Sequence, residues 1–374
     1  MGQIYFLLRS FTMELFSSIE MKDHEQITFF QDKLTGLKTI IGVHSTVLGP
    51  ALGGCRMWTY ENEAEALKDV LRLSRGMTYK AALAGLNLGG GKAVILANSQ
   101  TEKTSELLKS FGRAVEALSG RYITAEDVGM SVEDIDTIRS QTAYAVGGSN
   151  EGGSGDPSVM TAYGVFQGMK ACVKHLNLKN DLSELTVAVQ GVGHVGYHLC
   201  SYLHAAGCNI LVADIYPENT KRVQKEFGVK VLDAKEIHRV HCDIFAPCAL
   251  GSGLNSTTIP ELNCKIVAGS ANNQLATEAD GQRLMGRNIA YAPDYVINAG
   301  GLINVAAELD GYDQGKVMKK VAQIEETVAK VLNLGQKKNI PPQEAADELV
   351  ESILAQKRGR YLEFPHPQKM KNLK

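Results

Sequence analysis

Two lysines, Lys80 and Lys92, stand twelve positions apart in a segment made mainly of small and apolar residues. Burying an ammonium group without a partner is costly, and desolvation or a second nearby cation lowers the pKa of a lysine from its usual value of about 10.4. An amine with a pKa near neutrality can accept and return protons, whereas an amine that stays charged can hold a substrate carboxylate. The pair therefore predicts acid–base chemistry on a carboxylate-bearing substrate. The alternative is two surface lysines beside a packing turn.

Helical and strand patterns surround these lysines. Residues 61–78 carry apolar residues at the spacing of an amphipathic helix, and residues 93–97 form an apolar run that predicts a buried strand. Between them we expect a turn, followed by Gly89, Gly90 and Gly91, whose bare backbone a substrate or cofactor could approach. The other expectations for this half are strands over 38–47 and 121–124, a helix over 101–118, a helix start at Ser131 and a turn-rich segment over 49–57.

A glycine-rich sequence, Gly191-Val192-Gly193-His194-Val195-Gly196, follows an apolar β-rich run over 185–190 and precedes a helical pattern. In this context a GxGxxG sequence binds the pyrophosphate of a dinucleotide at the helix N-terminus. We expect Gly191 to make the turn, Gly193 to admit the pyrophosphate and Gly196 to allow close contact between helix and strand. The alternative is an ordinary glycine-rich turn.

Asp214 follows the next predicted strand, over 209–212, and lies eighteen residues after Gly196. A carboxylate at this place accepts hydrogen bonds from the adenosine ribose and repels a 2′-phosphate, so the sequence predicts NAD rather than NADP. The alternative is a capping aspartate. With the nucleotide site in the second half of the chain, residues 13–147 are left to bind the substrate and carry the chemistry.

The whole pattern predicts an α/β protein with two domains, because 374 residues exceed one ordinary core. In the second half, strand-like runs alternate with helical or loop segments, as in a doubly wound, Rossmann-type parallel sheet. We place the domain boundary in the Gly-, Ser- and Asn-rich segment 147–157. The remaining expectations are strands over 243–249, 265–269 and 295–297, helices over 161–175 and 315–334, and a last helix from Pro341-Pro342 to Gln356.

Composition and charge exclude several classes of function. Hydrophobic residues make up 44% of the chain, charged residues 21%, and the net charge is −2. Without a basic excess there is no electrostatic argument for a nucleic-acid partner, and no run approaches the ~18 apolar residues of a membrane span. Seven scattered cysteines without a CxxC pair indicate reduced thiols in a cytoplasmic protein and no metal site.

Several segments, in order along residues 13–364, resemble the Glu/Leu/Phe/Val amino-acid dehydrogenase family, and most closely its leucine-active branch. The segments that carry the resemblance are 50–57, 77–92, 124–129, 161–164, 269–274 and 298–301. The resemblance implies a substrate-binding and oligomerisation domain over 13–147, completed by a C-terminal helix that returns to it at about 340–364, and an NAD-binding domain over 148–335. Residues 1–12 and 365–374 remain extensions of unknown role. A homo-oligomer, either an octamer or a dimer, is also implied.

The resemblance further implies NAD-dependent, reversible oxidative deamination of an L-amino acid to the 2-oxo acid and ammonia. By position in the motifs, Lys80 binds the substrate carboxylate, Lys92 activates the attacking water, and Asp127 transfers protons to and from the amine. In this scheme the charge of Lys80 lowers the pKa of Lys92. Taken without the resemblance, Asp127 is a helix-capping carboxylate.

The remaining implied contacts divide between substrate and cofactor. The Gly53 and Gly54 backbone and Met77 lie at the substrate, Thr161 and Asn273 contact the nicotinamide half of NAD, and Asn298 lines the cleft. Taken alone, Thr161 and Asn298 are capping or turn residues. The sequence departs from the family pattern at Cys55, His194 and Gly196. Cys55 flanks the carboxylate-binding glycines, whereas Gly196 completes the nucleotide fingerprint.

The family's side-chain pocket falls on four apolar residues, Leu52, Ala125, Leu302 and Val305. None offers a partner for a second carboxylate, which argues against glutamate and favours the branched-chain substrates leucine, valine or isoleucine. Such pockets discriminate one methylene by only about 1–3 kcal/mol, so the preferred member is not fixed. Two alternatives stay open, a phenylalanine-type aromatic amino-acid dehydrogenase and a catalytically idle NAD-binding sensor.

Overall fold

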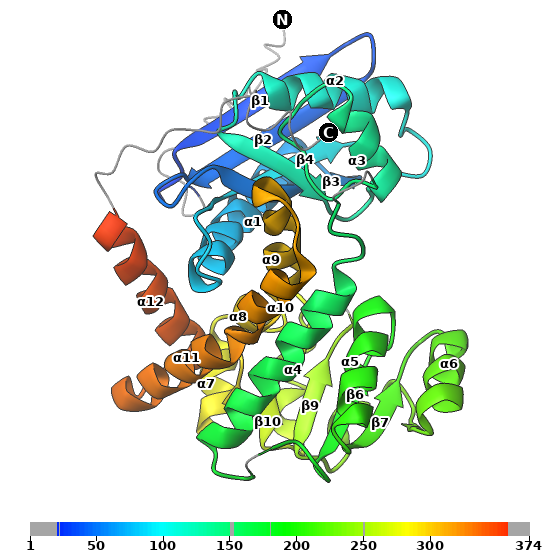
Figure 1. Cartoon of the computed structure of the whole chain (residues 1–374), viewed down its shortest axis with the longest axis vertical. Coiled ribbons are helices and arrows are strands. Elements are labelled where there is room, and N and C mark those ends of the chain that lie inside the picture. Colours follow the sequence, from blue (N-terminus) through cyan, green and yellow to red (C-terminus); the bar gives the residue numbers. More distant parts are fainter. Residues whose placement is uncertain (1–20, 22, 150–152, 180, 250, 358–374) are drawn as a thin grey trace, which may run out of the picture.

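The computed structural model describes residues 21, 23–149, 153–179, 181–249 and 251–357, and all statements below refer to these. Two β-sheets, one in each half of the chain, are stacked along the long axis of the molecule with helices around them (Figure 1). The extensions 1–12 and 365–374 lie outside the described residues. The predicted two-part α/β architecture is confirmed, while the exact boundary near residue 147 stays a prediction.

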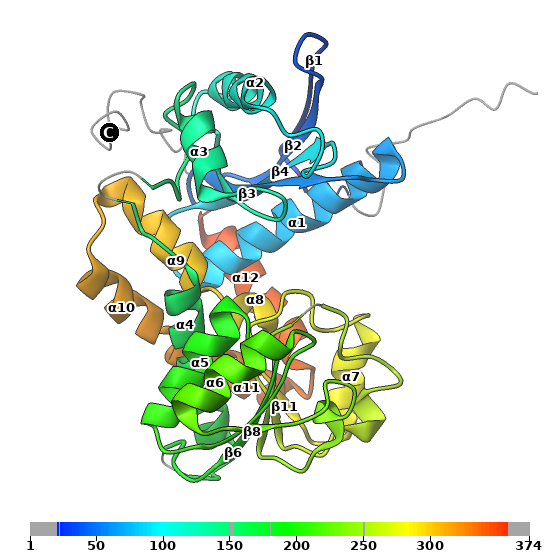
Figure 2. The same cartoon turned by 90° about the vertical axis from the view of Figure 1, so that its right-hand side faces the viewer.

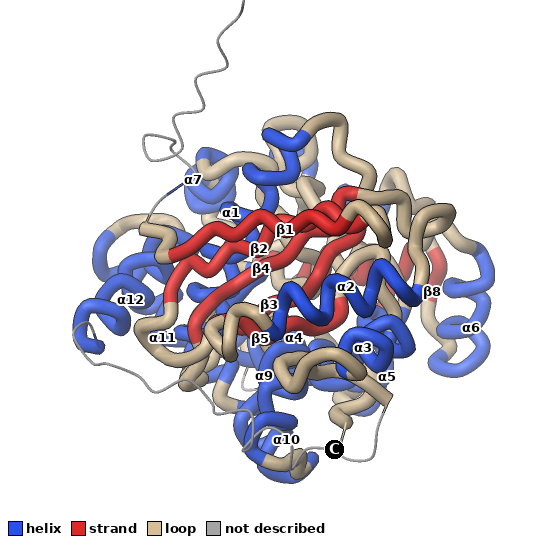
Figure 3. The backbone as a smooth tube through the Cα atoms, turned by 90° about the horizontal axis from the view of Figure 1, so that it is seen from above, coloured by secondary structure: helices blue, strands red, loops and turns tan. Residues whose placement is uncertain are grey.

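The first sheet has five strands in the order β1-β2-β4-β3-β5, with β1 at one edge and β5 at the other (Figure 3). Strands β3, β4 and β5 run parallel, whereas β1 and β2 are antiparallel to their neighbours. The lysine-bearing strand β4 therefore lies in the middle of the sheet. The strands are β1 (Gln26–Asp32), β2 (Leu37–Ser45), β3 (Ala51–Trp58), β4 (Gly89–Leu96) and β5 (Tyr122–Glu126).

Helix α1 (Glu63–Leu83) covers the face of this sheet that is turned toward the second half, and α2 (Ser105–Glu116) and α3 (Val132–Arg139) cover the other face (Figure 2). The α1 N-terminus is capped by Asn62, whose side chain accepts from the Glu65 backbone at 3.0 Å. The helix buries an apolar stripe that includes Leu67, Val70 and Leu71. Lys80 stands in its last turn.

The three glycines of β4 make close backbone packing possible. A Cβ on Gly90 would lie 2.0 Å from the Thr78 nitrogen of α1, and a Cβ on Gly89 would lie 1.9 Å from the Ser45 carbonyl oxygen. A Cβ on Gly91 would meet the Tyr122 ring at 2.7 Å. The expectation that substrate or cofactor approaches these glycines is therefore wrong, because protein atoms already fill that space.

The second sheet has six parallel strands in the order β11-β10-β9-β6-β7-β8. The order reverses at β6, and ligands of such sheets bind at the carboxyl ends of the strands beside that reversal. This arrangement confirms the predicted doubly wound fold. The strands are β6 (Thr186–Gln190), β7 (Asn209–Ala213), β8 (Lys230–Val231), β9 (Ile244–Pro247), β10 (Ile266–Val267) and β11 (Ala290–Tyr291).

Nine α-helices accompany the second sheet within the described residues, and α8, α9 and α12 also contact the first half of the chain. Their bounds are α4 (Ser158–His175), α5 (His194–Ala205), α6 (Pro217–Phe227), α7 (Ala279–Gly286), α8 (Asp294–Ile297), α9 (Gly300–Ala306), α10 (Gln314–Ala322), α11 (Ile324–Lys338) and α12 (Pro342–Lys357). Helix α9 packs Leu302 and Val305 against the core of the first sheet. Helix α12 lies against α1, as expected, where Tyr79 donates a hydrogen bond to Glu351.

Three local expectations are wrong. Residues 49–57, predicted as turn-rich, contain strand β3, whose glycines let its neighbours approach: a Cβ on Gly53 would lie 1.7 Å from the Gly91 oxygen. The apolar run 295–297 is helix α8 rather than a strand. The helix predicted over 315–334 is divided into α10 and α11 at Gln323, whose N–H bonds to Lys320 O at 3.1 Å in a tighter turn.

All seven cysteines are free thiols. Across the described ranges, the helices are too short or too polar for any of them to span a bilayer.

Candidate active site

The side chains of Lys92 and Asp127 form an ion pair between two strands of the first sheet. Lys92 projects from the middle of β4 and is 4% exposed, and its Nζ lies 2.9 Å from Asp127 Oδ2, just beyond the end of β5. Arg56 of the intervening strand β3 donates from Nε to the same oxygen at 3.0 Å. Burial raises the pKa of the Asp127 carboxyl, but the charges of Lys92 and Arg56 outweigh it, so its pKa is lowered.

Arg56 was not among the predicted site residues. Its Nη1 lies 2.9 Å from Asp69 Oδ2, which also accepts from the Tyr60 hydroxyl at 2.8 Å. This second carboxylate fixes the guanidinium so that its Nε points at Asp127. Both cations use Asp127 Oδ2, and Oδ1 is left for a proton or a ligand. The only sequence signal for Arg56 was its place directly after the glycine-rich patch.

Lys80 lines the same cavity as Lys92 and Asp127. This cavity, here called the lysine cavity, has a volume of about 480 Å³ and also includes Met77 of α1. The pKa of Lys80 is lowered to about 8, because burial and the charge of Lys92 outweigh the opposing charge of Asp294. Lys92, for its part, has the Asp127 carboxylate as its ion-pair partner at 2.9 Å.

The opposite wall of the lysine cavity comes from the second half of the chain. Asn272, Asn273 and Asp294 line it, together with Tyr291 and with Gln343 of α12. Of these, the sequence analysis singled out only Asn273. The lysine cavity thus opens between the two halves, with the predicted catalytic groups on one wall and amide and carboxylate groups on the other.

Asn298 supports this wall and is not one of the residues that line the lysine cavity. It is buried, and its Nδ2 donates to Asn272 Oδ1 at 2.8 Å and to Ser270 O at 3.1 Å. Thr161, in the first turn of α4, donates from Oγ1 to Pro157 O at 2.9 Å. A Cβ on Gly301 would lie 2.7 Å from Thr161 Oγ1, so Thr161 lies beside the start of α9.

The glycine-rich turn between β6 and α5 has the geometry that a dinucleotide requires. Gly191 has φ +92°, in the left-handed region. A Cβ on Gly196 would lie 2.1 Å from the Gly191 oxygen, so helix and strand are in close contact there. A Cβ on Gly193 would meet nothing within 4 Å, so the N-terminus of α5 is open to an anionic group. These residues fit a pyridine nucleotide.

Asp214 lies at the carboxyl end of β7 beside this turn. Its Oδ2 accepts from the Val192 backbone N–H at 2.8 Å, and its Oδ1 accepts from the Tyr216 N–H at 2.9 Å. Oδ2 also accepts from Asn219 Nδ2 at 3.2 Å, and the N-cap of α6 is Tyr216, so Asp214 does not cap that helix. Oδ1 keeps a second lone pair for a ribose hydroxyl. His194 and Val195 form the first turn of α5.

The apolar residues of the expected side-chain pocket come together in one cluster. Leu52 of β3 is 1% exposed in the core of the first sheet, and Ala125, Leu302 and Val305 pack against that core. Strands β3 and β5 and helix α9 thus contribute residues from both halves to this core, and none of the four lines the lysine cavity. The glycines beside them are close to the catalytic pair, since a Cβ on Gly54 would lie 2.8 Å from the Asp127 Cβ.

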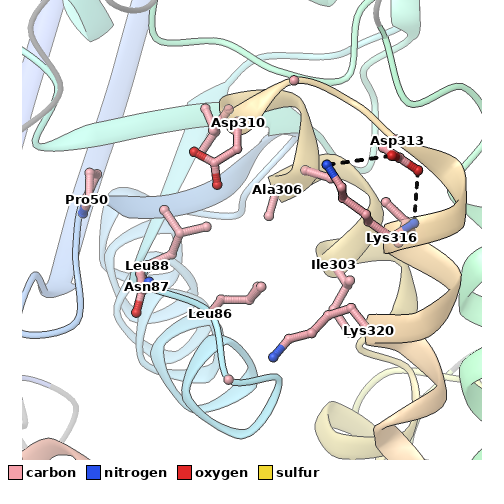
Figure 4. Close-up of a pocket in the computed structure, with 15 residues that line it drawn as sticks. Pro50, Leu86, Asn87, Leu88, Ile303, Ala306, Asp310, Asp313, Lys316 and Lys320 are labelled. Atoms are coloured by element: carbon pink, nitrogen blue, oxygen red, sulfur yellow. Dashed lines mark hydrogen bonds and ion pairs between the residues drawn. The ribbon is translucent and has the colours of Figure 1, made fainter.

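A separate groove lies between the turn after α1 and helices α9 and α10, and it contains none of the predicted site residues (Figure 4). This Leu86 groove has a volume of about 650 Å³. Leu86, Leu88 and Ile303 form its apolar wall, and the Lys320 amine extends toward the turn, 2.9 Å from the place that a Cβ on Gly85 would take. The groove offers no carboxylate paired with a buried amine, so the chemistry lies in the lysine cavity.

Two family models together match nearly the full length of the described chain. Residues 21–144 match the family model described as Glu/Leu/Phe/Val dehydrogenase, dimerisation domain. Residues 152–215 and 213–355 match the model described as Glutamate/Leucine/Phenylalanine/Valine dehydrogenase.

Leucine dehydrogenase of Geobacillus stearothermophilus is 52% identical over 358 residues, which is 95% of this chain and 98% of that protein. Valine dehydrogenase of Streptomyces albus is 46% identical, over 90% of this chain and 94% of its own. The crystal structure of L-tryptophan dehydrogenase from Nostoc punctiforme superimposes with a TM-score of 0.81 at 44% identity, covering 90% of this chain and 98% of its own. The chain therefore belongs to the Glu/Leu/Phe/Val dehydrogenase family, and it is a pyridine-nucleotide-dependent amino-acid dehydrogenase.

Proposed function

We propose that this enzyme catalyses the reversible, NAD-dependent oxidative deamination of a branched-chain L-amino acid. The amino acid, NAD⁺ and water give the 2-oxo acid, ammonium, NADH and a proton. The observation that carries the proposal is the ion pair of the buried Lys92 with Asp127, at 2.9 Å in the same cavity as Lys80. The 52% identity to a leucine dehydrogenase supports the branched-chain substrate.

In this proposal each side chain has one task. The Lys80 ammonium holds the substrate carboxylate, with the Gly53-Gly54 backbone beside it. NAD, when bound, supplies the acceptor for the hydride that leaves the substrate Cα. Lys92, once its proton has left, takes a proton from the water that attacks the resulting imine carbon. Asp127 exchanges protons with the substrate nitrogen through Oδ1, the oxygen that neither cation occupies.

The same proposal assigns the cofactor to the turn at Gly191–Gly196, with Asp214 at the ribose and Thr161 and Asn273 at the nicotinamide half. The open space over Gly193 at the start of α5 supports this assignment. A carboxylate at Asp214 favours NAD over NADP because it repels a 2′-phosphate. Replacement of Asp214 by Ala should therefore weaken discrimination against NADP, measured as the ratio of kcat/KM for the two cofactors. An unchanged ratio would show that the Asp214 carboxylate does not contact the adenosine ribose.

A substrate panel tests the reaction. With NAD at alkaline pH, we expect NADH formation with leucine, valine and isoleucine and little with glutamate, because Leu52, Ala125, Leu302 and Val305 offer no partner for a second carboxylate. Absence of NADH formation with all three would remove the proposal. An aromatic preference is the second candidate, because the L-tryptophan dehydrogenase of Nostoc punctiforme is 46% identical. Turnover on phenylalanine and tryptophan relative to leucine decides between them.

A homo-oligomer is the state that we propose for this chain. The N-terminal family model is described as a dimerisation domain, and a glutamate dehydrogenase with the same fold is described as hetero-hexameric. Strand β1 is an edge strand that pairs only with β2 in the described chain, and Phe29 on it is 55% exposed. Light scattering coupled to size-exclusion chromatography gives the number of subunits, for which a dimer and an octamer are the two expectations.

A further inference from the structure

Asp294 is a carboxylate of the cofactor-side wall that the proposed chemistry does not use. It follows Pro293 and is the first residue of α8, a short helix that lies between the two sheets (Figure 2). Together with Lys80, Lys92 and Asp127, it lines the lysine cavity. Burial raises the pKa of Asp294, and the charge of Lys80 opposes that rise. A half-buried carboxylate facing a cavity needs partners, and Asp294 has them in both halves of the chain.

The first partner is the loop after β10, which carries two of the asparagines of the cofactor-side wall. The backbone N–H of Asn273 donates to Asp294 Oδ2. Asn273 has φ +52°, in the left-handed region that asparagine adopts more readily than most residues. Its backbone N–H is bonded to the Asp294 carboxylate, which therefore helps to fix the position of Asn273, the residue expected at the nicotinamide.

The second partner is Lys80 on the opposite wall. Three charged side chains act on the Lys80 amine from the elements around it: Asp294 from α8, Lys92 from β4 and Asp127 after β5. Asp294 has the largest effect of the three and favours the ammonium form, whereas Lys92 disfavours it. Asp127 contributes less, since Lys92 and Arg56 already hold it. The carboxylate with the largest effect on the pKa of Lys80 thus faces it across the lysine cavity from the other half of the molecule.

We propose that Asp294 is a positioning residue that acts in two directions, keeping Lys80 in the ammonium form that binds the substrate carboxylate and holding the Asn273 loop in place for the cofactor. The proposal rests on the proposed function for the statement that Lys80 binds the substrate carboxylate. One side chain then connects the carboxylate site of the first half with the cofactor wall of the second. The other groups that face Asp294 are Tyr291, whose hydroxyl lies 3.5 Å from Oδ1, and Tyr295 on the same helix.

Two substitutions separate the two tasks. Asp294→Asn keeps an oxygen that can accept from the Asn273 N–H but removes the charge, whereas Asp294→Ala removes both. Asp347→Asn is the matched control: this carboxylate accepts from the Tyr295 hydroxyl at 2.6 Å and pairs with Arg75 at 3.5 Å, but it does not line the lysine cavity. Thermal unfolding of each variant checks that it is folded.

The protonation of Lys80 is measured on the full-length protein by trace labelling with acetic anhydride over a range of pH, followed by mass spectrometry of the peptide that contains Lys80. The expected midpoint in the parent protein is about 8. Asp294→Asn should move this midpoint to lower pH by about one pH unit, because a nearby carboxylate that stabilised the ammonium has been removed. Asp347→Asn should leave it in place. A midpoint in Asp294→Asn equal to that of the parent protein overturns the first half of the proposal.

Binding of NADH, followed by its fluorescence, tests the second half. We expect Asp294→Asn to bind NADH like the parent protein and Asp294→Ala to bind it several-fold more weakly. Equal binding by both variants overturns the role in holding the loop. Failure of the proposed function is distinguishable, because it would appear as absence of turnover on every amino acid tested, whereas the labelling midpoint and NADH binding require no turnover.

Discussion

Arg56 is the residue whose contribution the structure adds most clearly to the catalytic pair, since it holds Asp127 through the same oxygen as Lys92. Arg56→Gln should raise the pKa of Asp127, because one of the two cations that lower it has been removed. The Asp127 carboxylate then takes up a proton at higher pH, so activity should begin to fall at a higher pH on the acidic side of the profile.

The measurement for Arg56 is the pH dependence of kcat/KM for leucine on the acidic side. Arg72→Gln is the control, because Arg72 pairs with Asp69 at 3.3 Å without reaching Asp127. The account would be contradicted if the pH at which kcat/KM falls on the acidic side were unchanged in Arg56→Gln. It would also be contradicted if this pH shifted equally in Arg56→Gln and Arg72→Gln.

Lys80 gives a prediction on the alkaline side. Its pKa is lowered to about 8, so the ammonium that binds a carboxylate is present below that pH and is lost as the pH rises through it. We expect 4-methylpentanoate, a leucine analogue without an amine, to bind with constant affinity below pH 8 and progressively more weakly above it. Isothermal titration calorimetry measures this. Lys80→Gln should bind the analogue weakly at every pH, and a pH dependence equal to that of the parent protein in this variant would exclude Lys80 as its cause.

At the residue level, the sequence was sufficient for groups that lie within motifs and insufficient for groups that meet through folding. Lys80, Lys92 and the glycine-rich turn were all predicted, and the structure brings both lysines to one cavity. Arg56 and Asp127 are 71 positions apart, and their contact depends on the pairing of β3 with β5. Asp294 stood directly before the run 295–297, which was interpreted as a strand. Neither the pairing of β3 with β5 nor the short helix α8 can be recognised from the spacing of residues in the sequence.

The packing of α1 on β4 is the element that positions Lys80, and its weak point is Gly90. In Gly90→Ala the new Cβ would lie 2.0 Å from the Thr78 nitrogen, so α1 has to move away from the sheet. We expect a loss of about 1–3 kcal/mol in the free energy of unfolding, measured by urea denaturation. Gly76→Ala, in the same helix with nothing within 4 Å of the new Cβ, should be neutral or stabilising by about 0.5–1 kcal/mol. Equal stability of both variants would contradict the packing argument.

The sequence predicted an element correctly where its apolar pattern was long. The prediction was wrong where the apolar run was short, as at α8, or where one pattern continued across two helices, as at Gln323. The strands and helices around the nucleotide turn follow their patterns closely, from β6 (Thr186–Gln190) to α5 (His194–Ala205). Helix α8 (Asp294–Ile297) has only four residues, and a short apolar run does not distinguish helix from strand. The break at Gln323 contains neither glycine nor proline, so the sequence carries no sign of it.

At the scale of the molecule, the two halves are connected by α9, which packs against the first core, and by α12, which packs against α1. This leaves the edge strand β1 as a surface for association. If β1 forms a subunit contact, Phe29→Asp should reduce the number of subunits measured by light scattering. Leu34→Asp, at a residue that is 98% exposed in the neighbouring turn, serves as control and should leave the assembly unchanged. An unaltered assembly in Phe29→Asp would place the interface elsewhere.

The most direct test of the account is the rate of NADH formation from leucine at alkaline pH in Lys92→Ala, compared with Lys320→Ala in the separate Leu86 groove. The account predicts a loss of about 10²–10⁴-fold in kcat for Lys92→Ala, with unchanged NADH binding, and near-parental activity for Lys320→Ala. Parental activity in Lys92→Ala would contradict the assignment of the chemistry to the lysine cavity.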